Sequence, residues 1–592
     1  NEHIWLLYAS LGYSCISSWL SEEQRSHIIV NLFQPMLDMF TVKYDYDFDR
    51  IHNHGLWAVA AVGICGLAIG EDKYVDMSVN GLDGTAETGG FLAQLNNLFA
   101  PSGYYMEGPY YHAFAITPVC LFAEALHRHR PELDILNHKH GVIGTTIQAL
   151  LATAYPNGQF PALNDASRTK NTSDTGVLIA VGLCFKHYSQ DAVLQGMAKI
   201  QQRVWLHPNG LALSRAVAKA GKVKSPHWQS VQLSDGPQGD RGAHAFLRMN
   251  GDHGETSQLV MNFGQHGEGH GHFDALGISL FNRGQVVLQD YGFCRWVNVE
   301  PKFGGRYLAE NQGFARQTIA HNLVAVDEQC QNAGDVSRAD AKWGTPHFFI
   351  GDSDKLQAVS AFADDFYTGV EQQRSILMLK IPELPEPLLI DLFRLGSQQT
   401  HQYDYSLQLD GQFIDANFEV HQNTELHPLG SSCGYQHLWD VSRGKPDGHA
   451  RISWLQGSSF YTWRGACGPN AEVIFTRVGA NDPEFNLRSE SGIILRQRGS
   501  NHLFASVLET HGYFSEASEV CTDATSKLSD IRIIGSNSVG SVVEIIGLEF
   551  SLIIMLSNQR DVTQDTLHEI EFDNKTFSWE GYMAVTQGGI QS

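Results

Sequence analysis

The chain has no paired-cysteine motif, few basic residues and no long apolar run, and each absence excludes a class of protein. Its 9 cysteines are scattered over 592 residues without a C-x-x-C pair, so neither a disulfide framework nor a cysteine zinc module is indicated. Lysine and arginine number 41 against 64 acidic residues, a net charge of −23, which argues against nucleic acid as a partner. The longest apolar run, from Gly55 to Gly70, is too short to cross a bilayer. We therefore expect a buried helix there and no membrane span.

The remaining composition is that of a folded protein. Hydrophobic residues make up 43% and charged residues 18%, and 592 residues are enough for several domains. The chain begins at Asn1 in a helical pattern without a secretory signal, so we expect its natural N-terminus to lie upstream. A periplasmic or secreted location is favoured, and the alternatives for its assembly include a homodimer.

The first 215 residues have the pattern of helices joined by short turns. Ser21-Glu-Glu-Gln24 forms a capping box, which is typical of a helix start. Further helices are predicted over Leu56–Ile69, Gly90–Phe99, Ala115–His129 and Val142–Tyr155. Helices of this length and spacing indicate an (α/α) toroid or incomplete barrel rather than a simple bundle.

From Ser230 onward the pattern changes to short runs of alternating apolar and polar residues. Such runs predict β-strands, and their number predicts a large antiparallel β-sandwich. The fold class is therefore α+β and multidomain. We expect a helical domain over 1–215, which is incomplete at its N-terminus, a central sandwich with a metal site over 228–490, and a C-terminal β-sheet domain over 491–592. The basic segment 219–227 is the predicted connection between helices and strands.

Polar residues gather between Gln265 and Asn322, at the ends of predicted strands. Four of them are possible metal ligands: His270, His272, Asp290 and His321. Tyr307 follows Arg306 in the same segment. Histidine, aspartate, tyrosine and arginine held by a rigid sheet are typical of a functional site. The alternative is a solvated, histidine-rich loop beside one structural metal.

A second polar group lies in the helical half. Asn53 and His54 stand at the start of the apolar helix, where backbone N–H groups and the helix dipole favour a carboxylate. Tyr110 and Tyr111 also stand just before a predicted helix, after Glu107. The alternatives are that Asn53 caps its helix and that the two tyrosines are packing residues whose hydroxyl groups remain in solvent.

Taken together, these segments resemble a known family. They are Asn53-His54, Glu107–Tyr111, Gly269–Asp274, Leu288–Gly292, Tyr307–Asn311 and Gln317–Asn322. Their order and spacing resemble the heparinase II/III-like polysaccharide lyases, most closely the family 17 oligoalginate lyases. The resemblance covers nearly the whole chain from about residue 40. It implies cleavage of alginate, an anionic uronate polymer, by β-elimination, with unsaturated monomers released from a chain end.

The resemblance also implies roles for individual residues. Asn53 and His54 would neutralise the substrate carboxylate. Tyr307 would take the C5 proton and Tyr110 would protonate the leaving oxygen, with Tyr111 as a rival for that acid; the reverse assignment of acid and base between the two tyrosines is the alternative. His270 would join them as a catalytic residue. Substrate contacts are expected from Tyr111, His112, Arg295, Arg306 and Glu509. His272, Asp290 and His321 match the ligands of one zinc ion, which we expect to be structural because elimination needs no metal.

Three other functions fit parts of the pattern. A zinc hydrolase could use the His270–His321 cluster to activate water. A non-catalytic carbohydrate-binding protein would bind the polymer without turnover. A glycosaminoglycan lyase would need more basic residues around its site than Arg295, Arg306, Arg316 and Lys302 provide. An elimination differs from hydrolysis by the C=C bond in its product.

Overall fold

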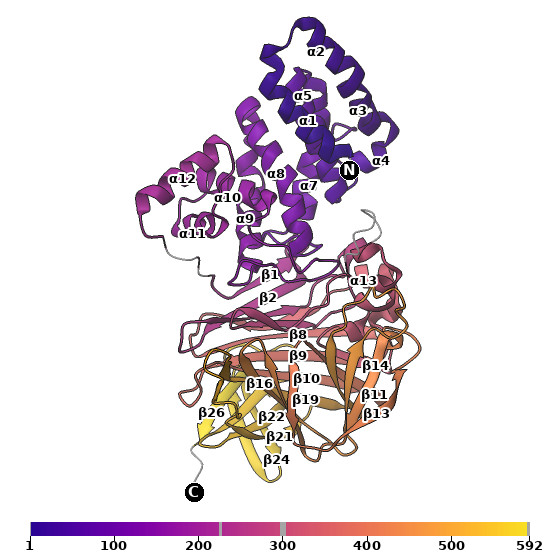
Figure 1. Ribbon diagram of the computed structural model, residues 1–592, viewed down its shortest axis with the longest axis vertical. Coiled ribbons are helices and arrows are strands. Elements are labelled where there is room, and N and C mark those ends of the chain that lie inside the picture. Colours follow the sequence, from indigo (N-terminus) through magenta and orange to yellow (C-terminus); the bar gives the residue numbers. More distant parts are fainter. Residues whose placement is uncertain (1, 224–225, 227, 296–303, 589–592) are drawn as a thin grey trace. The chain divides into compact units, whose positions relative to one another are not determined.

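The computed structural model describes residues 2–223, 226, 228–295 and 304–588, and the chain divides into two compact units (Figure 1). The helical unit comprises Asn1–Phe160, Arg168–Trp228 and Leu233–Arg241, and the sandwich unit comprises Pro161–Ser167, Gln229–Gln232 and Gly242–Ser592. A separate domain over 491–592 stays a prediction. The predicted connection 219–227 includes residues 224, 225 and 227, which lie outside the described residues.

The helical unit contains the helices predicted from the sequence and several more. They are α1 (Glu2–Ile16), α2 (Glu22–Ile28), α3 (Gln34–Asp38), α4 (Asp45–Phe48), α5 (Asn53–Ile69), α6 (Asp72–Asn80), α7 (Gly90–Leu98), α8 (Pro109–His129), α9 (His138–Thr153), α10 (Thr175–His187), α11 (Ala192–Gln201) and α12 (Pro208–Ala220). The capping box at Ser21 and Gln24 is present at the start of α2. Among the described residues no helix combines the length and apolar character needed to cross a membrane.

Helix α5 is the centre of the helical unit. It is apolar on all sides and therefore buried on all sides, and it packs against α1, α6 and α8. At Gly63 an added Cβ would lie 2.3 Å from the Phe122 ring of α8, so this crossing requires glycine. The close packing fixes the N-terminal ends of α5 and α8, which carry the predicted site residues.

The sandwich unit is built from antiparallel sheets. The nine-stranded sheet has the order β12-β15-β16-β19-β10-β9-β8-β7, and β20 also pairs with β19. Its strands are β7 (Thr345–Ile350), β8 (Leu356–Tyr367), β9 (Val370–Leu379), β10 (Leu388–Ser397), β12 (Gln412–Ala416), β15 (His449–Gln456), β16 (Ser459–Ala466), β19 (His502–Ser515) and β20 (Val520–Thr522). The six-stranded sheet has the order β13-β14-β17-β18-β11-β6. Its strands are β6 (Val324–Val326), β11 (His401–Leu409), β13 (Val420–Pro428), β14 (Leu438–Gly444), β17 (Glu472–Val478) and β18 (Ser491–Gly499).

Smaller sheets complete the unit. Strands β2 (Arg241–Asn250), β3 (Thr256–Asn262), β4 (Ile278–Asn282) and β5 (Gln285–Leu288) follow one another in one sheet, and β1 (Val231–Asp235) precedes them in the chain. Strands β21 (Leu528–Ser536), β22 (Gly540–Gly547), β23 (Ser551–Ser557) and β26 (Met583–Gly588) form a four-stranded sheet, and β24 (Leu567–Phe572) pairs with β25 (Lys575–Glu580). A short helix, α13 (Val336–Asp340), lies between β6 and β7.

Two hydrophobic cores hold these sheets face to face. The first contains buried aromatic residues from both large sheets, including Tyr405, Trp454 and Trp463. The second joins the nine-stranded sheet to the four-stranded one through residues such as Ile390 and Ile545. The alternation of buried and exposed residues along the strands is what the sequence predicted.

A buried arginine connects the nine-stranded sheet to the loops of the predicted metal site. Arg374 of β9 pairs with Asp391 of β10 at 2.5 Å, and its Nη1 donates to the carbonyl oxygens of Leu276 and Asn322, each at 2.6 Å. Because a buried charge is costly unless it is paired and hydrogen-bonded, these contacts favour one position of the two loops.

Candidate functional site

The start of α5 presents Asn53 and His54, as the sequence predicted. The residue that caps the helix is His52, whose Nδ1 accepts the backbone N–H of His54 at 3.2 Å. Asn53 is the first helical residue, and its amide donates to Glu107 Oε2 at 2.8 Å. An amide nitrogen has two N–H donors, so this bond orients the group and uses only one of them.

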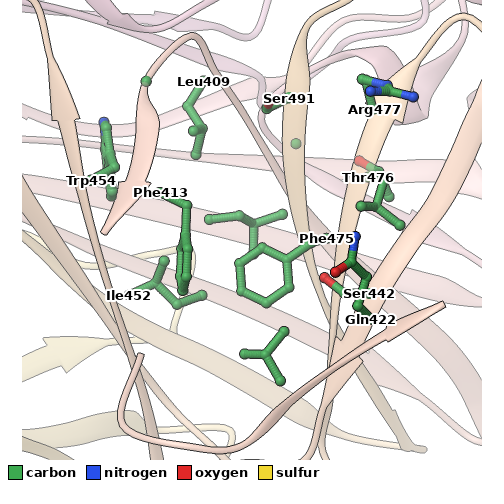
Figure 2. A pocket seen from close by; sticks show the side chains of 15 residues that line it. Leu409, Phe413, Gln422, Ser442, Ile452, Trp454, Phe475, Thr476, Arg477 and Ser491 are labelled. Atoms are coloured by element: carbon green, nitrogen blue, oxygen red, sulfur yellow. The ribbon is translucent and has the colours of Figure 1, made fainter. Parts of the chain in front are cut away.

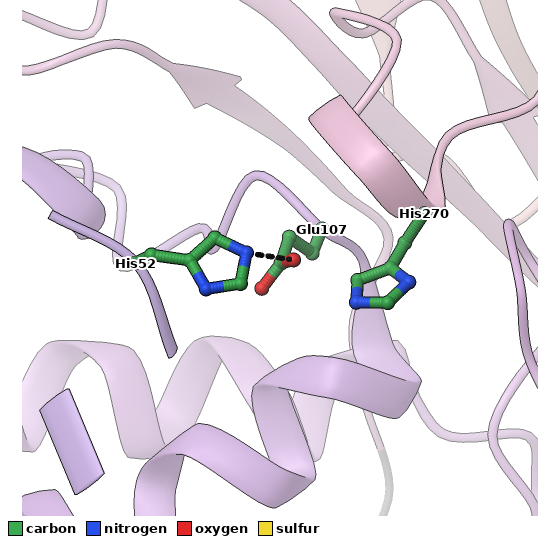
Figure 3. A group of neighbouring side chains, drawn as sticks. All are labelled: His52, Glu107 and His270. Carbon is green, nitrogen blue, oxygen red and sulfur yellow. Dashed lines mark ion pairs between the residues drawn. The ribbon is translucent and has the colours of Figure 1, made fainter. Parts of the chain in front are cut away.

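Glu107 is the centre of this polar group, which we call the helical cluster (His52, Asn53, His54, Tyr105 and Glu107). Its side chain is 1% exposed. His52 Nε2 lies 3.4 Å from its carboxylate (Figure 3), and the Tyr105 hydroxyl donates to it. Burial, followed by the charge that His52 can carry, lowers the pKa of His54. A neutral imidazole and an amide are thus placed at the helix start.

The start of α8 carries Tyr110 and Tyr111. Their rings meet edge to face at 5.0 Å, and Lys170 Nζ lies 5.4 Å from the centre of the Tyr110 ring. Tyr110 is half-buried and Tyr111 is buried, so Tyr110 is the better placed of the two to meet a ligand.

His112, in the first turn of α8, differs from its predicted role. It is buried, and its Nε2 lies 2.7 Å from the Thr146 hydroxyl. That hydroxyl donates to Gly103 O at 2.7 Å, so it accepts from His112. Burial lowers the pKa of His112 to about 3. The residue is a neutral core histidine joining α8 to α9, and this geometry does not support a substrate contact.

In the sandwich unit, Asp165 connects the residues that the sequence singled out. Asn311 Nδ2 donates to its Oδ1 at 2.7 Å, His272 Nε2 lies 3.2 Å away, and the Arg316 guanidinium donates to Oδ2. His270 Nδ1 lies 3.7 Å from the same carboxylate. Burial alone would raise the pKa of Asp165, but the contacts with His270 and His272 and the charge of Arg316 hold it well below its ordinary value. Asp165 is therefore a buried anion that is fully paired.

Arg306 joins His270 to Tyr307. Its Nη1 lies 2.9 Å from His270 Nδ1, and its Nη2 donates to the Tyr307 hydroxyl oxygen at 3.0 Å. The guanidinium carbon also lies 4.7 Å from the centre of the Tyr307 ring. Tyr307 is 48% exposed, so its hydroxyl is held in place yet open to a ligand. We call Asp165, His270, Arg306, Tyr307 and Arg316 the sandwich cluster.

The three predicted metal ligands lie together. His272, Asp290 and His321 each offer a buried ligand atom, and these atoms lie within 4.8 Å of one another. His272 Nδ1 and His321 Nε2 are buried and have no hydrogen-bond partner among the described residues. Two neutral imidazole nitrogens and a carboxylate are suitable zinc ligands, so these residues fit the metal. Because Asp165 contacts the other nitrogen of His272, it is placed to orient that ligand.

Comparison with known proteins gives the family. Residues 15–162 match the model of the alginate lyase family, and residues 232–523 match that of the heparinase II/III-like C-terminal region. The chain is 36% identical to an alginate lyase of Stenotrophomonas maltophilia and 34% identical to an exo-oligoalginate lyase of Saccharophagus degradans. These alignments cover 98% and 99% of this chain and 77% and 79% of the relatives. The chain belongs to the heparinase II/III-like alginate lyases.

Solved structures support the same fold at much lower identity. A heparinase III aligns with a TM-score of 0.56 at 12% identity, over 93% of this chain and 68% of that one. The heparan sulfate lyase HepC from Pedobacter heparinus aligns with a TM-score of 0.54 at 13% identity, over 90% and 69%. At this identity the likeness concerns the fold alone, and it confirms the predicted order of helical and β-rich parts.

Two glycines of this family member bring the sandwich cluster and the metal ligands together. At Gly271, between His270 and His272, an added Cβ would lie 1.6 Å from His266 O. Gly292, two residues after Asp290, has φ +65°, and an added Cβ would lie 2.4 Å from Ala166 O. Both positions therefore require glycine, and the second holds the Asp290 loop against the loop that carries Asp165.

Two predicted substrate contacts have other surroundings. Glu509 of β19 is 2% exposed, and its carboxylate accepts from Ser526 Oγ at 2.5 Å and from the backbone N–H groups of Lys527 and Leu528. This geometry does not support a substrate contact by Glu509, because the carboxylate already organises the turn before β21. Arg295 is exposed, and its backbone N–H donates to Asn486 O at 2.9 Å. Its role stays a prediction.

Asp165 and His52 are the residues that the sequence did not reveal. Asp165 lies 107 positions before His272, in a loop without periodicity, and only the folded chain brings the two together. His52 was passed over because its neighbours Asn53 and His54 matched the family motif. Glu107 belonged to a quoted motif, but nothing in that motif showed that it would be the buried partner of Asn53.

Proposed function

We propose that this protein is an alginate or oligoalginate lyase that cleaves its polymer by β-elimination. The observation that carries the proposal is the exposed Tyr307 side chain, whose hydroxyl accepts from Arg306, in a chain whose relatives are named alginate lyase and exo-oligoalginate lyase. The substrate is a 4-linked uronate, and the reaction removes the proton at C5 and expels the oxygen at C4.

Neutralisation of the uronate carboxylate is the first requirement. The C5 proton is poorly acidic beside an ionised carboxylate, and hydrogen-bond donors lower the barrier by stabilising the enediolate that forms. We assign this task to Asn53 and His54. Their position at the N-terminus of α5 adds the positive end of the helix dipole, and the bond to Glu107 fixes the orientation of the Asn53 amide.

Proton transfer is assigned to the tyrosines. Arg306 donates to the Tyr307 oxygen at 3.0 Å, and a cationic donor stabilises a phenolate more than a phenol. Tyr307 is therefore the base for the C5 proton. Tyr110, which is half-buried and has Lys170 over its ring, is the acid that protonates the C4 oxygen. His270 holds Arg306 from its other side and so positions the base.

We assign one zinc ion to His272, Asp290 and His321. A metal ion bound there would cross-link the three loops that carry these residues. The side chains described above perform the elimination, so we assign the metal a structural role and no role in the reaction. Asp165 is the residue that connects this site to the sandwich cluster through His272 and Arg316.

Exolytic cleavage with release of unsaturated monomers is the mode we propose, in keeping with the name of the Saccharophagus relative. A panel of uronate polymers, including alginate oligomers, heparan and chondroitin, tests the substrate and the mode together. Ultraviolet absorbance follows the new C=C bond, chromatography gives product sizes, and viscometry gives chain length. We expect absorbance to rise on alginate oligomers with monomer present from the start and viscosity falling slowly. A rapid fall in viscosity with di- and trisaccharide products would contradict the exolytic mode.

A further inference from the structure

A groove at one edge of the β-sandwich is separate from both clusters. Strands β12 and β13 end the nine- and six-stranded sheets, and among the described strands each pairs on one side only, with β15 and β14 respectively. Between the two sheet edges lies a cavity of about 430 Å³. This volume falls within the range of small-molecule sites, roughly 300–1,000 Å³.

Aromatic residues form the centre of this edge groove. Phe413 of β12 and Phe475 of β17 meet edge to face at 5.3 Å, and Phe413 is 46% exposed. Figure 2 shows the two rings in the middle, with Ile452 and Trp454 on one side and Gln422 and Ser442 on the other. Two aromatic rings together with Ile452 and Trp454 give one contiguous apolar lining inside a concave site, and such a lining is typical of a ligand-binding groove.

Polar groups line the opposite side of the edge groove. Thr476, Arg477 and Ser491 belong to its lining, together with Gln422 and Ser442. Arg477 is exposed, and within the described part of the chain its guanidinium has no ion-pair or hydrogen-bond partner. In a chain of net charge −23, an unpaired arginine in the same lining as the exposed Phe413 ring favours an anionic ligand. A guanidinium fork matches a carboxylate in particular.

We propose that the edge groove is a second, non-catalytic binding site for a uronate oligosaccharide. A uronate has an apolar C–H face that can lie on Phe413 and Phe475, a carboxylate for Arg477, and hydroxyl groups for Gln422 and Ser442. The ligand class rests on the proposed function, but the site itself does not. Such a site would hold the polymer on the enzyme between successive cuts and raise its local concentration.

The experiment counts binding sites in an enzyme that does not consume the ligand. Calorimetric titration of the Tyr307→Phe full-length protein with saturated alginate tetrasaccharides should show two sites. Adding Arg477→Gln should abolish one site or weaken it about tenfold or more, the usual effect of removing a charge-assisted hydrogen bond. Adding Phe413→Ala should weaken the same site by a similar factor, because it removes the apolar surface on which the sugar would lie. The matched controls Arg498→Gln and Ile414→Ala should keep both sites. Ile414 neighbours Phe413 on the same strand and is 48% exposed, but it does not line the groove.

Each other outcome overturns the proposal. A single site in the Tyr307→Phe protein, or two sites that survive both groove substitutions in folded protein, removes the edge groove as a binding site. Equal binding of a neutral tetrasaccharide, or stronger binding of octanoate in competition, shows that the ligand is not a uronate.

An activity assay separates failure of this inference from failure of the proposed function. The same batch of wild-type protein is assayed by ultraviolet absorbance. Absence of unsaturated product there contradicts the proposed function, whereas a single binding site in the Tyr307→Phe protein together with normal product from the wild type contradicts only this inference.

Discussion

The helical cluster and the sandwich cluster are each built around one buried carboxylate, but the partners of the two carboxylates differ. Glu107 contacts the amide of Asn53, the hydroxyl of Tyr105 and the ring of His52. Asp165 contacts the cation Arg316 as well as histidines and an amide. The first arrangement orients the Asn53 amide, and the second fixes a network of charges.

This difference suggests a division of labour. The Asn53 amide and the neutral His54 ring can bind a substrate carboxylate through hydrogen bonds at the start of a helix. A permanent positive charge there would bind the product as tightly as the transition state and would not speed the reaction. A charged network in a low-dielectric interior holds its members rigidly, which suits a base whose position must be fixed. We therefore assign binding of developing charge to the helical cluster and proton removal to the sandwich cluster.

The largest effect is expected from removing the base. Tyr307→Phe keeps the ring and removes the hydroxyl, so turnover should fall by about 10³- to 10⁴-fold, the upper range for a general base, with little change in thermal stability. Initial rates of ultraviolet absorbance on alginate oligomers measure it. Tyr513→Phe is the control, since Tyr513 lies in the same unit and is 50% exposed. Near-normal turnover in folded Tyr307→Phe protein would remove Tyr307 from the mechanism.

Removing Asn53 or His54 should reduce activity less than removing Tyr307, and the reduction should appear mainly in kcat. Asn53→Ala and His54→Ala should each lower kcat by about 10²- to 10³-fold, as for loss of one donor to an oxyanion, and change KM much less. Full steady-state kinetics separate the two constants. Asn97→Ala serves as the control, because the Asn97 amide donates to Ala93 O within α7. If only KM rose, both residues would be ordinary binding contacts.

The metal site should affect stability before activity. His272→Ala or His321→Ala should lose the bound ion and lower the melting temperature, because the free energy of metal binding contributes to folding. Metal analysis and thermal unfolding measure both effects, and a chelator should bring wild-type protein to the same melting temperature. His502→Ala, a change at a half-buried histidine of β19, should keep the metal. Full metal content in the His272 and His321 variants would show that the ligands are misassigned.

The smallest effect, a change in the pH dependence of stability, is expected at a third buried carboxylate, Glu124 of α8. This residue lies in the helical unit but does not belong to the helical cluster. Burial would raise the pKa of Glu124, but hydrogen bonds from His187, Asn209 and Arg128 lower it from 4.5 to about 2. The ionised carboxylate therefore stabilises the fold fully above about pH 4.5, and this contribution is lost as the pH falls toward 2. Glu124→Gln should flatten the fall in unfolding free energy over this range, while Glu87→Gln, at an exposed residue of the same unit, should not. Parallel curves for wild type and Glu124→Gln would contradict the assignment.

Much of the fold follows from local sequence patterns, and part of the site does not. The apolar run before Gly70, the capping box at Ser21 and the alternating runs after Ser230 predicted elements that the structure contains, because periodicity and capping act over short distances. His272, Asp290 and His321 could be named as proposed metal ligands because each belongs to a short motif, and the structure brings the three side chains together. Asp165 could not, since its importance arises only when its loop meets His272 and Arg316. His112 and Glu509 were assigned to the substrate because sequence does not show that their polar atoms are satisfied inside the fold.

Elimination and hydrolysis of the glycosidic bond differ in whether water enters the products, and we propose elimination. Digestion of saturated alginate oligomers in water enriched in ¹⁸O, followed by mass spectrometry of the products, tests it directly. We expect that no ¹⁸O enters the products at cleavage and that each new non-reducing end lacks one water relative to a hydrolytic product, in step with the rise in ultraviolet absorbance. Incorporation of one ¹⁸O per cleavage, with no gain in absorbance, would show that the protein is a hydrolase and not a lyase.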